Sequence, residues 1–332
     1  MKKLLAGVLA CSLTGIFGIA AKDAVAAGAD KFPEKSVEFV VQWSAGGGYD
    51  VLIRAIAAQF PKYANGQQLI IKNVPGGGSA IGTLEVLRAK PDGYTLGAHS
   101  TPIVTKMHWD KVAYDVDSFE PVMMFADIPC YFMVHKNSPY KDLNDLLTAA
   151  KASPGTITLG NAGSGGGTHL VGMAFQGQTG ASFKNVPFEG GGPAITALLG
   201  EHVDVFVGSS PEGVTNAKAG DLRVLGIFAD QRMAQFLDVL TAEEQGIKFY
   251  GTMWRGIMAP KGTPREIVDR LDEIFKKCAD DPEFVKIATE MGWPRKYLAS
   301  ADFKAFVEKE DVRWKELMIK FQLGNRYKSQ FK

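Results

Sequence analysis

Hydrophobic and polar residues follow one another in short blocks that predict repeated strand–loop–helix units. Val37–Trp43 is a mostly apolar run rich in β-forming residues, Gly46-Gly47-Gly48 interrupts it, and Val51–Phe60 continues at helical spacing. The same unit then recurs, with strands expected at Leu69–Val74 and Tyr94–Ala98. Alternation of this kind is typical of an α/β protein, in which helices cover both faces of a parallel sheet.

The pattern restarts after about residue 128 and predicts a second α/β unit. Asp142 is expected to cap a helix that runs through Lys151. The further strands are expected at Tyr131–Val134, Ile157–Gly160, Phe183–Phe188, Val203–Val207 and Leu222–Phe228, and the further helices at Thr168–Gln178, Pro193–Leu199, Pro264–Cys278, Pro282–Met291 and Asp302–Phe321. We therefore expect two Rossmann-like lobes joined by a hinge of two crossings, near residues 128 and 252. Lobe one comprises 27–127 plus 252–332, and lobe two comprises 128–251.

The first 26 residues have the pattern of a secretory signal. Lys2 and Lys3 precede the apolar stretch Leu4–Ala21, and Ala24-Val25-Ala26 fits a small-residue cleavage site. We expect cleavage after Ala26 and a soluble, exported mature chain. The alternatives are an uncleaved anchor and a lipid on Cys11, which follows Val8-Leu9-Ala10.

Charge and cysteine content narrow the function classes. The 332-residue chain has a formal charge of +1, and this lack of a basic excess argues against nucleic-acid binding. Hydrophobic residues make up 46% of the chain and charged residues 22%, as in an ordinary globular protein. Beyond the signal only Cys130 and Cys278 remain. The sequence allows two alternatives, a single disulfide between them or two unpaired buried thiols.

Glycine is the unusual residue, because 12 of the 37 glycines stand in four Gly-Gly-Gly runs. The runs at 46–48 and 165–167 each lie between a predicted strand and a predicted helix, one in each lobe. Such a turn exposes unpaired main-chain N–H groups at the positive end of a helix, which attracts anions. No Gly-Lys pair and no completed Gly-x-Gly-x-x-Gly fingerprint is present, so nucleotide cofactors are disfavoured. Small carboxylates remain, and no cofactor is expected.

An exported hydrolase is the alternative from another class. Ser164 lies in Ala162-Gly163-Ser164-Gly165-Gly166, which resembles a nucleophile elbow. The only histidines after it are His169 and His202, and the only acids between Ser164 and His202 are Glu189 and Glu201, which are poorly placed for a triad. The five histidines of the chain also lack metal-site spacing, so we expect neither catalysis nor a metal site.

Six motifs follow one another along essentially the whole mature chain. They read Trp43-Ser44-Ala45-Gly46-Gly47-Gly48-Tyr49-Asp50, Asn73-Val74-Pro75-Gly76-Gly77-Gly78, Pro91-Asp92-Gly93-Tyr94-Thr95-Leu96, Asn161-Ala162-Gly163-Ser164-Gly165-Gly166-Gly167-Thr168-His169-Leu170, Val186-Pro187-Phe188-Glu189-Gly190-Gly191-Gly192-Pro193-Ala194 and Ala259-Pro260-Lys261-Gly262-Thr263-Pro264. In this order they resemble the substrate-binding family of the tripartite tricarboxylate transporters, also called the Bug or TctC-like receptors.

The resemblance implies a type II periplasmic binding protein with a Venus-flytrap fold, which hands a carboxylate to a membrane permease. It implies that a ligand carboxylate lies between the two glycine loops and is held by main-chain N–H groups. The expected donors are Gly46, Gly47, Gly48 and Tyr49 in lobe one, and Ser164, Gly165, Gly166, Thr168 and His169 in lobe two. We expect a mono-, di- or tricarboxylate ligand, a monomer and no nucleic-acid partner. A receptor that reports to a membrane sensor kinase is the alternative among binding proteins.

Specificity is expected from loops at the carboxyl ends of the strands. These residues are His99, Ser100 and Thr101 in lobe one and Gly208, Ser209 and Ser210 in lobe two. Asp50 is expected to cap its helix rather than to touch the ligand. Tyr49, Phe188 and Glu189 depart from the family pattern, and Tyr49 is expected to narrow the pocket or stack on the ligand. Arg255 is expected to lie on the surface at the hinge, with pairing to a second carboxylate as the alternative.

Overall fold

The computed structural model describes residues 31–188 and 190–327, so the expected signal segment lies outside the described residues. In the described ranges, strands and helices alternate as the sequence predicts, and the strands form one continuous sheet in the order β2-β1-β3-β9-β4-β7-β5-β6. The remaining two strands, β8 and β10, both pair with β4. The strands are β1 (Val37–Val41), β2 (Leu69–Asn73), β3 (Thr95–Ser100), β4 (Phe119–His135), β5 (Thr158–Asn161), β6 (Lys184–Pro187), β7 (Val205–Ser209), β8 (Leu222–Ile227), β9 (Thr252–Pro260) and β10 (Arg295–Ala299).

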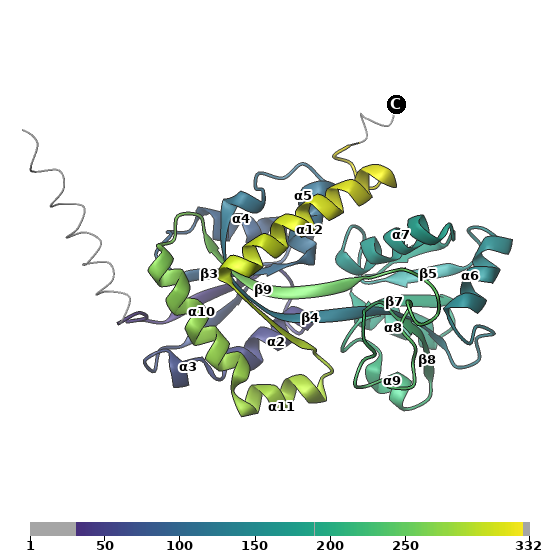
Figure 1. Cartoon of the computed structure of the whole chain (residues 1–332), viewed down its shortest axis with the longest axis horizontal. Coiled ribbons are helices and arrows are strands. Elements are labelled where there is room, and N and C mark those ends of the chain that lie inside the picture. The colour runs from purple at the N-terminus through teal and green to yellow at the C-terminus, as the bar shows by residue number, and fades with distance from the viewer. Residues whose placement is uncertain (1–30, 189, 328–332) are drawn as a thin grey trace, which may run out of the picture.

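The helices pack on both faces of this sheet (Figure 1). In lobe one, α4, α5 and α12 lie on one face of the sheet. Helices α2, α3, α10 and α11 lie on the other face (Figure 1). Their bounds are α2 (Gly48–Ala57), α3 (Phe60–Tyr63), α4 (Ala80–Arg88), α5 (Thr101–Trp109), α6 (Leu143–Ala152), α7 (Gly167–Thr179), α8 (Gly191–Leu199), α9 (Val214–Lys218), α10 (Arg265–Asp280), α11 (Pro282–Glu290) and α12 (Ser300–Lys320), with short 3-10 turns η1 (Gly77–Ser79) and η2 (Val116–Ser118).

Most of the predicted elements are present within a few residues of their expected bounds. Asp142 caps α6 as predicted, because its side chain accepts a hydrogen bond from the N–H of Asp145. Thr101, predicted to lie in a loop, is instead the first residue of α5, which follows β3 without a break. None of the helices in the described ranges has the length and apolar character needed to cross a bilayer.

Strands β4 and β9 connect the two lobes. They pair antiparallel from Phe119 opposite Pro260 to Pro129 opposite Thr252, and β4 continues for six more residues into the second lobe. The sequence pattern predicted only Tyr131–Val134 of this 17-residue strand. Its side chains are buried on both faces, so they show no alternation, and Pro121 lies beside one of two shifts in register. The expected crossings near 128 and 252 fall within β4 and at the start of β9, and we keep them as the proposed lobe boundaries.

The strand directions make the carboxyl ends of the two lobes face each other. In lobe one, β1 and β3 run parallel to each other. Because β9 is antiparallel to both β3 and β4, these strands also run in the direction of β4. In lobe two, β7 and β5 run parallel to each other and opposite to β4. Ser100, at the end of β3, pairs with Arg255 of β9, which pairs in turn with Ala126 of β4. Ser209, at the end of β7, pairs with Cys130 of β4. The two strand ends therefore meet β4 at positions four residues apart, or about 13 Å along the strand. Ligands of open α/β sheets bind at such strand ends.

An aromatic cluster forms the core of the second lobe. The ring of Phe132 on β4 lies 4.8 Å from that of Phe175 and 4.9 Å from that of Phe228, and all three side chains are fully buried. Of the two alternatives for Cys130 and Cys278, the structure shows unpaired thiols, and both are buried. The aromatic residues Phe303 and Trp314 of α12 are also core residues.

Replacing Phe132 by alanine should therefore lower the free energy of unfolding by about 3–5 kcal/mol, because it leaves a cavity among rings that cannot collapse into it. The measurement is urea unfolding followed by circular dichroism. The matched control is Ile70→Ala, whose side chain is 54% exposed and should cost about 1 kcal/mol or less. Equal losses for both variants would contradict the proposed core.

Candidate functional site

The first glycine loop uses two of its predicted donors internally. Gly46, with a φ of +79°, donates its N–H to Oδ2 of Asp50 at 2.8 Å, and Gly47 donates to the carbonyl oxygen of Ser44 at 3.3 Å. The N–H groups of Gly48 and Tyr49 in the first turn of α2 have no acceptor among the described residues. Two of the four predicted donors are thus available for a ligand, and the other two shape the loop.

Asp50 holds this loop in place. Its buried carboxylate also accepts hydrogen bonds from Nε of Arg54 at 2.9 Å and Nδ2 of Asn73 at 2.8 Å. Burial acts to raise the pKa of Asp50, but the hydrogen bonds from Arg54, Gly46 and Asn73 outweigh it and hold the pKa below its ordinary value. Asp50 is structural, as expected, but it does not cap α2, because the residue at the cap position is Gly47.

The second glycine loop repeats the first in its main-chain geometry. Gly165, with a φ of +72°, donates its N–H to Nδ1 of His169 at 3.0 Å, and Gly166 donates to the carbonyl oxygen of Gly163 at 3.1 Å. The predicted donors Gly165 and Gly166 are therefore also used internally. The N–H groups of Ser164 and Thr168 have no acceptor in the described part of the chain. The hydroxyl of Thr168 accepts from the N–H of Ala162 at 3.2 Å.

Residues 44–50 and 163–169 therefore form the same motif twice. In each, a left-handed glycine donates to the side chain four residues later, and the next glycine donates three residues back. The glycines that precede the two helices have matching dihedral angles, φ −70° and ψ 161° for Gly47 and φ −74° and ψ 166° for Gly166. The bracing side chains are Asp50 and His169, which differ chemically and so hide the repeat in the sequence.

Strand β9 connects the two loops. A Cβ on Gly167 would lie 2.2 Å from Cε of Met253, so the start of α7 packs directly on this side chain. The guanidinium carbon of Arg255 lies 5.7 Å from the ring centroid of Tyr49, in the first turn of α2. Because Met253 and Arg255 are two residues apart on one strand, they face the same side, about 7 Å from each other. The starts of α2 and α7 thus meet neighbouring side chains of β9.

Arg255 is buried, with 8% of its surface exposed, so the expectation of a surface arginine is wrong. Its guanidinium makes no hydrogen bond or ion pair with residues 31–188 or 190–327, and Nε is fully buried without a partner. Burial lowers the pKa of Arg255, and the nearby Tyr49, Cys130 and Glu212 act in the opposite direction. A buried cation without a counter-charge is unfavourable, which is the situation that an anionic ligand would relieve.

Tyr49 belongs to the lobe-one core. Its ring packs against those of Phe39 and Phe125, with centroids 6.3 and 6.1 Å away, and its hydroxyl donates to the carbonyl oxygen of Gly256. Burial raises its pKa well above the ordinary value. With 4% of its surface exposed, the side chain is not placed to stack on a ligand, and only its main-chain N–H remains available.

The strand-end residues divide between the two faces of the sheet. Ser100 pairs with Arg255 and lies on the same face. It is fully buried, and its hydroxyl has no partner among residues 31–188 and 190–327. His99 lies on the other face, fully buried beside the rings of Trp254 at 5.3 Å and Phe303 at 5.5 Å, and burial lowers its pKa to about 3. Thr101 accepts the N–H of Trp254 at 3.2 Å. Ser100 therefore lies beside Arg255. His99 is packed among aromatic rings with both ring nitrogens lacking a partner in the described part of the chain, and Thr101 links the start of α5 to β9.

In lobe two, the end of β7 lies next to an acidic group that the sequence analysis did not single out. The N–H of Ser209 donates to Oε2 of Glu212 at 3.3 Å. Gly208 packs on the ring of Phe206, and the hydroxyl of Ser210 donates to the carbonyl oxygen of Met291 in the other lobe at 2.8 Å. Burial raises the pKa of Glu212 to about 7, although Ser209 and Arg255 oppose the shift. No local sequence signal distinguishes Glu212 from an exposed glutamate.

Known proteins match this chain over most of its length. The sequence model of the tripartite tricarboxylate transporter family receptors matches residues 52–323. This chain belongs to that family. A Cupriavidus necator relative, the "UPF0065 protein in gbd 5' region", is 32% identical over 96% of each chain. Among solved structures, the receptor is similar to MatC of Rhodopseudomonas palustris with bound malate (28% identity, TM-score 0.76, covering 86% of this chain and 99% of that one).

A second R. palustris structure, which contains adipate, is 26% identical with a TM-score of 0.80 and covers 88% of the receptor and 99% of its own chain. The resemblance seen in the motifs and the two-lobe periplasmic-binding fold are therefore confirmed. The family and these neighbours are binding proteins rather than enzymes. Among the described residues, no group of His, Cys, Asp or Glu side chains is arranged to hold a metal ion.

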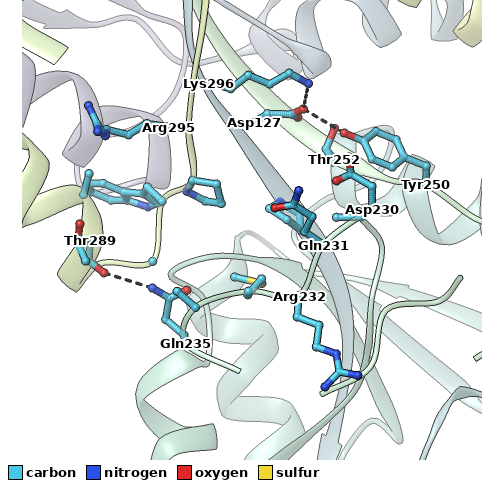
Figure 2. Close-up of a pocket in the computed structure, with 18 residues that line it drawn as sticks. Asp127, Asp230, Gln231, Arg232, Gln235, Tyr250, Thr252, Thr289, Arg295 and Lys296 are labelled. Atoms are coloured by element: carbon cyan, nitrogen blue, oxygen red, sulfur yellow. Dashed lines mark hydrogen bonds and ion pairs between the residues drawn. The ribbon is translucent and has the colours of Figure 1, made fainter. Parts of the chain in front are cut away.

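The receptor also has a cavity of about 510 Å³ between its lobes, away from the glycine loops (Figure 2). One wall is the segment 229–235 of lobe two and the other is 288–296, and Gln235 bridges them by donating to the carbonyl oxygen of Thr289 at 3.2 Å. On the hinge side, Asp127 accepts from Lys296 at 2.8 Å and from the hydroxyl of Tyr250 at 3.1 Å (Figure 2). None of the predicted site residues lines this cavity.

The brace in the second loop predicts a pH-dependent stability. His169 accepts through Nδ1, and burial lowers its pKa below the ordinary value. The neutral ring is thus favoured in the folded state, so its contribution is fully present above pH ~6.5 and is lost as the pH falls. We expect the free energy of unfolding of the wild-type protein to be about 1 kcal/mol higher than that of His169→Ala at pH 7.5. At pH 5 the difference should be smaller.

The measurement is urea unfolding of both proteins at the two pH values. An advantage of wild type that stays constant or grows toward acid pH would exclude the neutral brace.

Proposed function

We propose that this protein is a periplasmic receptor that captures a small organic carboxylate in the gap between its lobes. Membership of the tripartite tricarboxylate receptor family supports the transport role. The malate and adipate in two neighbouring structures support a carboxylate as the ligand class. The proposal includes delivery to a membrane permease of the tricarboxylate type, with the receptor acting as a monomer.

The observation that carries the proposal is the buried guanidinium of Arg255 beside free main-chain donors. An arginine fork matches a carboxylate, and a buried pair of this kind is favourable only when the remaining lone pairs are also hydrogen-bonded. The starts of α2 and α7, which meet neighbouring side chains of β9, offer the N–H groups that would do this. A carboxylate at this position meets one full positive charge and preorganised donors at once.

The proposed ligand set follows from which groups are free. Arg255 supplies the charge and Ser100 a hydroxyl, and the main-chain donors are Gly48, Tyr49, Ser164 and Thr168. Gly46, Gly47, Gly165 and Gly166 act by shaping the loops. Ser209 and Gly208 border the opposite side of the gap. Closure of the lobes about β4 and β9 would bury the ligand and present a new surface to the permease.

Binding without catalysis is part of the proposal. Ser164, the serine of the hydrolase alternative, is exposed, and its side chain makes no hydrogen bond to a described histidine or acid. The Nδ1 atom of His169 is occupied by the N–H of Gly165, which leaves it to brace the loop. The signal pattern of the first 26 residues, with its expected cleavage after Ala26, supports the proposed periplasmic location.

The test replaces Arg255 by methionine. Because the substitution removes an unpaired buried charge, Arg255→Met without ligand should be at least as resistant to urea as the wild-type protein without ligand. Its affinity for the carboxylates that raise the wild-type Tm should fall at least tenfold. A thermal-shift screen of mono-, di- and tricarboxylates followed by calorimetric titration measures both quantities.

The matched control is Arg265→Met, at an arginine whose side chain is 60% exposed and which should bind as wild type does. Unchanged carboxylate affinity in Arg255→Met would refute the role of this arginine, and a wild-type protein that binds none of the carboxylates would refute the receptor function.

A further inference from the structure

Glu212 is an acidic residue of lobe two whose carboxylate is bonded at the end of β7, where Ser209 pairs with Cys130 of β4, four residues along that strand from the partner of Arg255. It follows β7 after Ser210-Pro211, and its hydrogen bond from the N–H of Ser209 holds the carboxylate at the carboxyl end of the strand. A Cβ on Gly191 would lie 2.1 Å from Oε1, so the carboxylate covers the first residue of α8. The positive end of this nine-residue helix favours the ionised form of Glu212.

Glu212 and Arg255 interact without forming an ion pair. Each shifts the pKa of the other, but no N···O contact within 4.0 Å joins them. The other titratable groups that face Glu212 are Cys130 on β4 and Tyr131, whose hydroxyl donates to the main-chain oxygen of Glu212. By strand register, the carboxylate of Glu212 is held level with Cys130 of β4 and Arg255 is level with Ala126 of the same strand, so an anion of lobe two and a cation of β9 lie near each other. Neither has a charged partner in the described ranges.

We propose that the ligand carries both a carboxylate and an ammonium group, that is, an amino acid, with its carboxylate on Arg255 and its ammonium on Glu212. This inference rests on the proposed carboxylate-binding function and adds the chemistry of the second ligand group. Arg255 belongs to a strand shared by both lobes and Glu212 to lobe two alone, so one zwitterion would connect them.

Charge balance favours an amino acid over a simple dicarboxylate. The second carboxylate of a diacid would approach the carboxylate of Glu212, and two like charges in a site shielded from water repel each other strongly. An ammonium group at the same position forms a favourable pair and leaves neither Arg255 nor Glu212 without a partner. Burial raises the pKa of Glu212 to about 7 in the empty protein, and a bound ammonium would lower it again.

The experiment compares matched pairs that differ only in the amino group. The mature wild-type chain is titrated calorimetrically at pH 8 with aspartate against succinate, glutamate against glutarate, alanine against propionate, and leucine against 4-methylpentanoate. We expect the amino acid of the best-binding pair to bind at least tenfold more tightly than its partner. Equal or tighter binding of the desamino acid in every pair would overturn the inference and leave the receptor function intact, whereas no binding by any acid would remove both.

Two variants identify the responsible group. Glu212→Gln keeps the shape of the side chain and should lose at least tenfold in affinity for the amino acid while leaving the desamino acid unchanged or tighter. Glu243→Gln, at an exposed glutamate of the same lobe, is the control and should bind as wild type does. Circular dichroism confirms folding of both variants. An unchanged preference in Glu212→Gln would overturn the inference, and the wild-type pairs test it even if this variant does not fold.

Discussion

The antiparallel ladder between β4 and β9 is the interaction on which the rest of the structure depends. Both strands run through the boundary between the lobes, and their pairing reverses the chain so that strands of lobe one and lobe two end toward each other. The same ladder places Arg255 level with the end of β3, beside the start of α2. An open sheet needs a topological switch to create a binding crevice, and here the two shared strands provide it.

The site combines one fixed charge with neutral donors that are already oriented. In each glycine loop, two glycine N–H groups form hydrogen bonds within the loop. One of the two is accepted by a side chain, that of Asp50 in the first loop and that of His169 in the second. That bracing holds the remaining donors at the starts of α2 and α7 without further loss of entropy on binding. Arg255 then adds the attraction that neutral donors lack, and its cost in the empty protein is the reason to expect a tightly held anion.

The sequence predicts the elements well where the period of the hydrophobic residues is clear, and it predicts the glycine loops from the residue types that such turns need. It misses most of β4, because uniform burial removes the alternation that identifies a strand. It also places Arg255 on the surface, because burial of one arginine depends on strand pairings between residues more than 100 positions apart. Which glycine amides are free is likewise decided by where the side chains of Asp50 and His169 point, which no local pattern records.

The most direct test follows individual amide protons as ligand is added. Two-dimensional ¹H–¹⁵N spectra of the mature chain, selectively labelled at glycine and threonine, would be recorded with the carboxylate that most raises Tm. The amide protons of Gly48 and Thr168 should move downfield and exchange more slowly with solvent, while those of Gly46 and Gly165, already bonded inside their loops, should change little. Ligand-induced shifts at Gly46 and Gly165 with none at Gly48 and Thr168 would contradict the account.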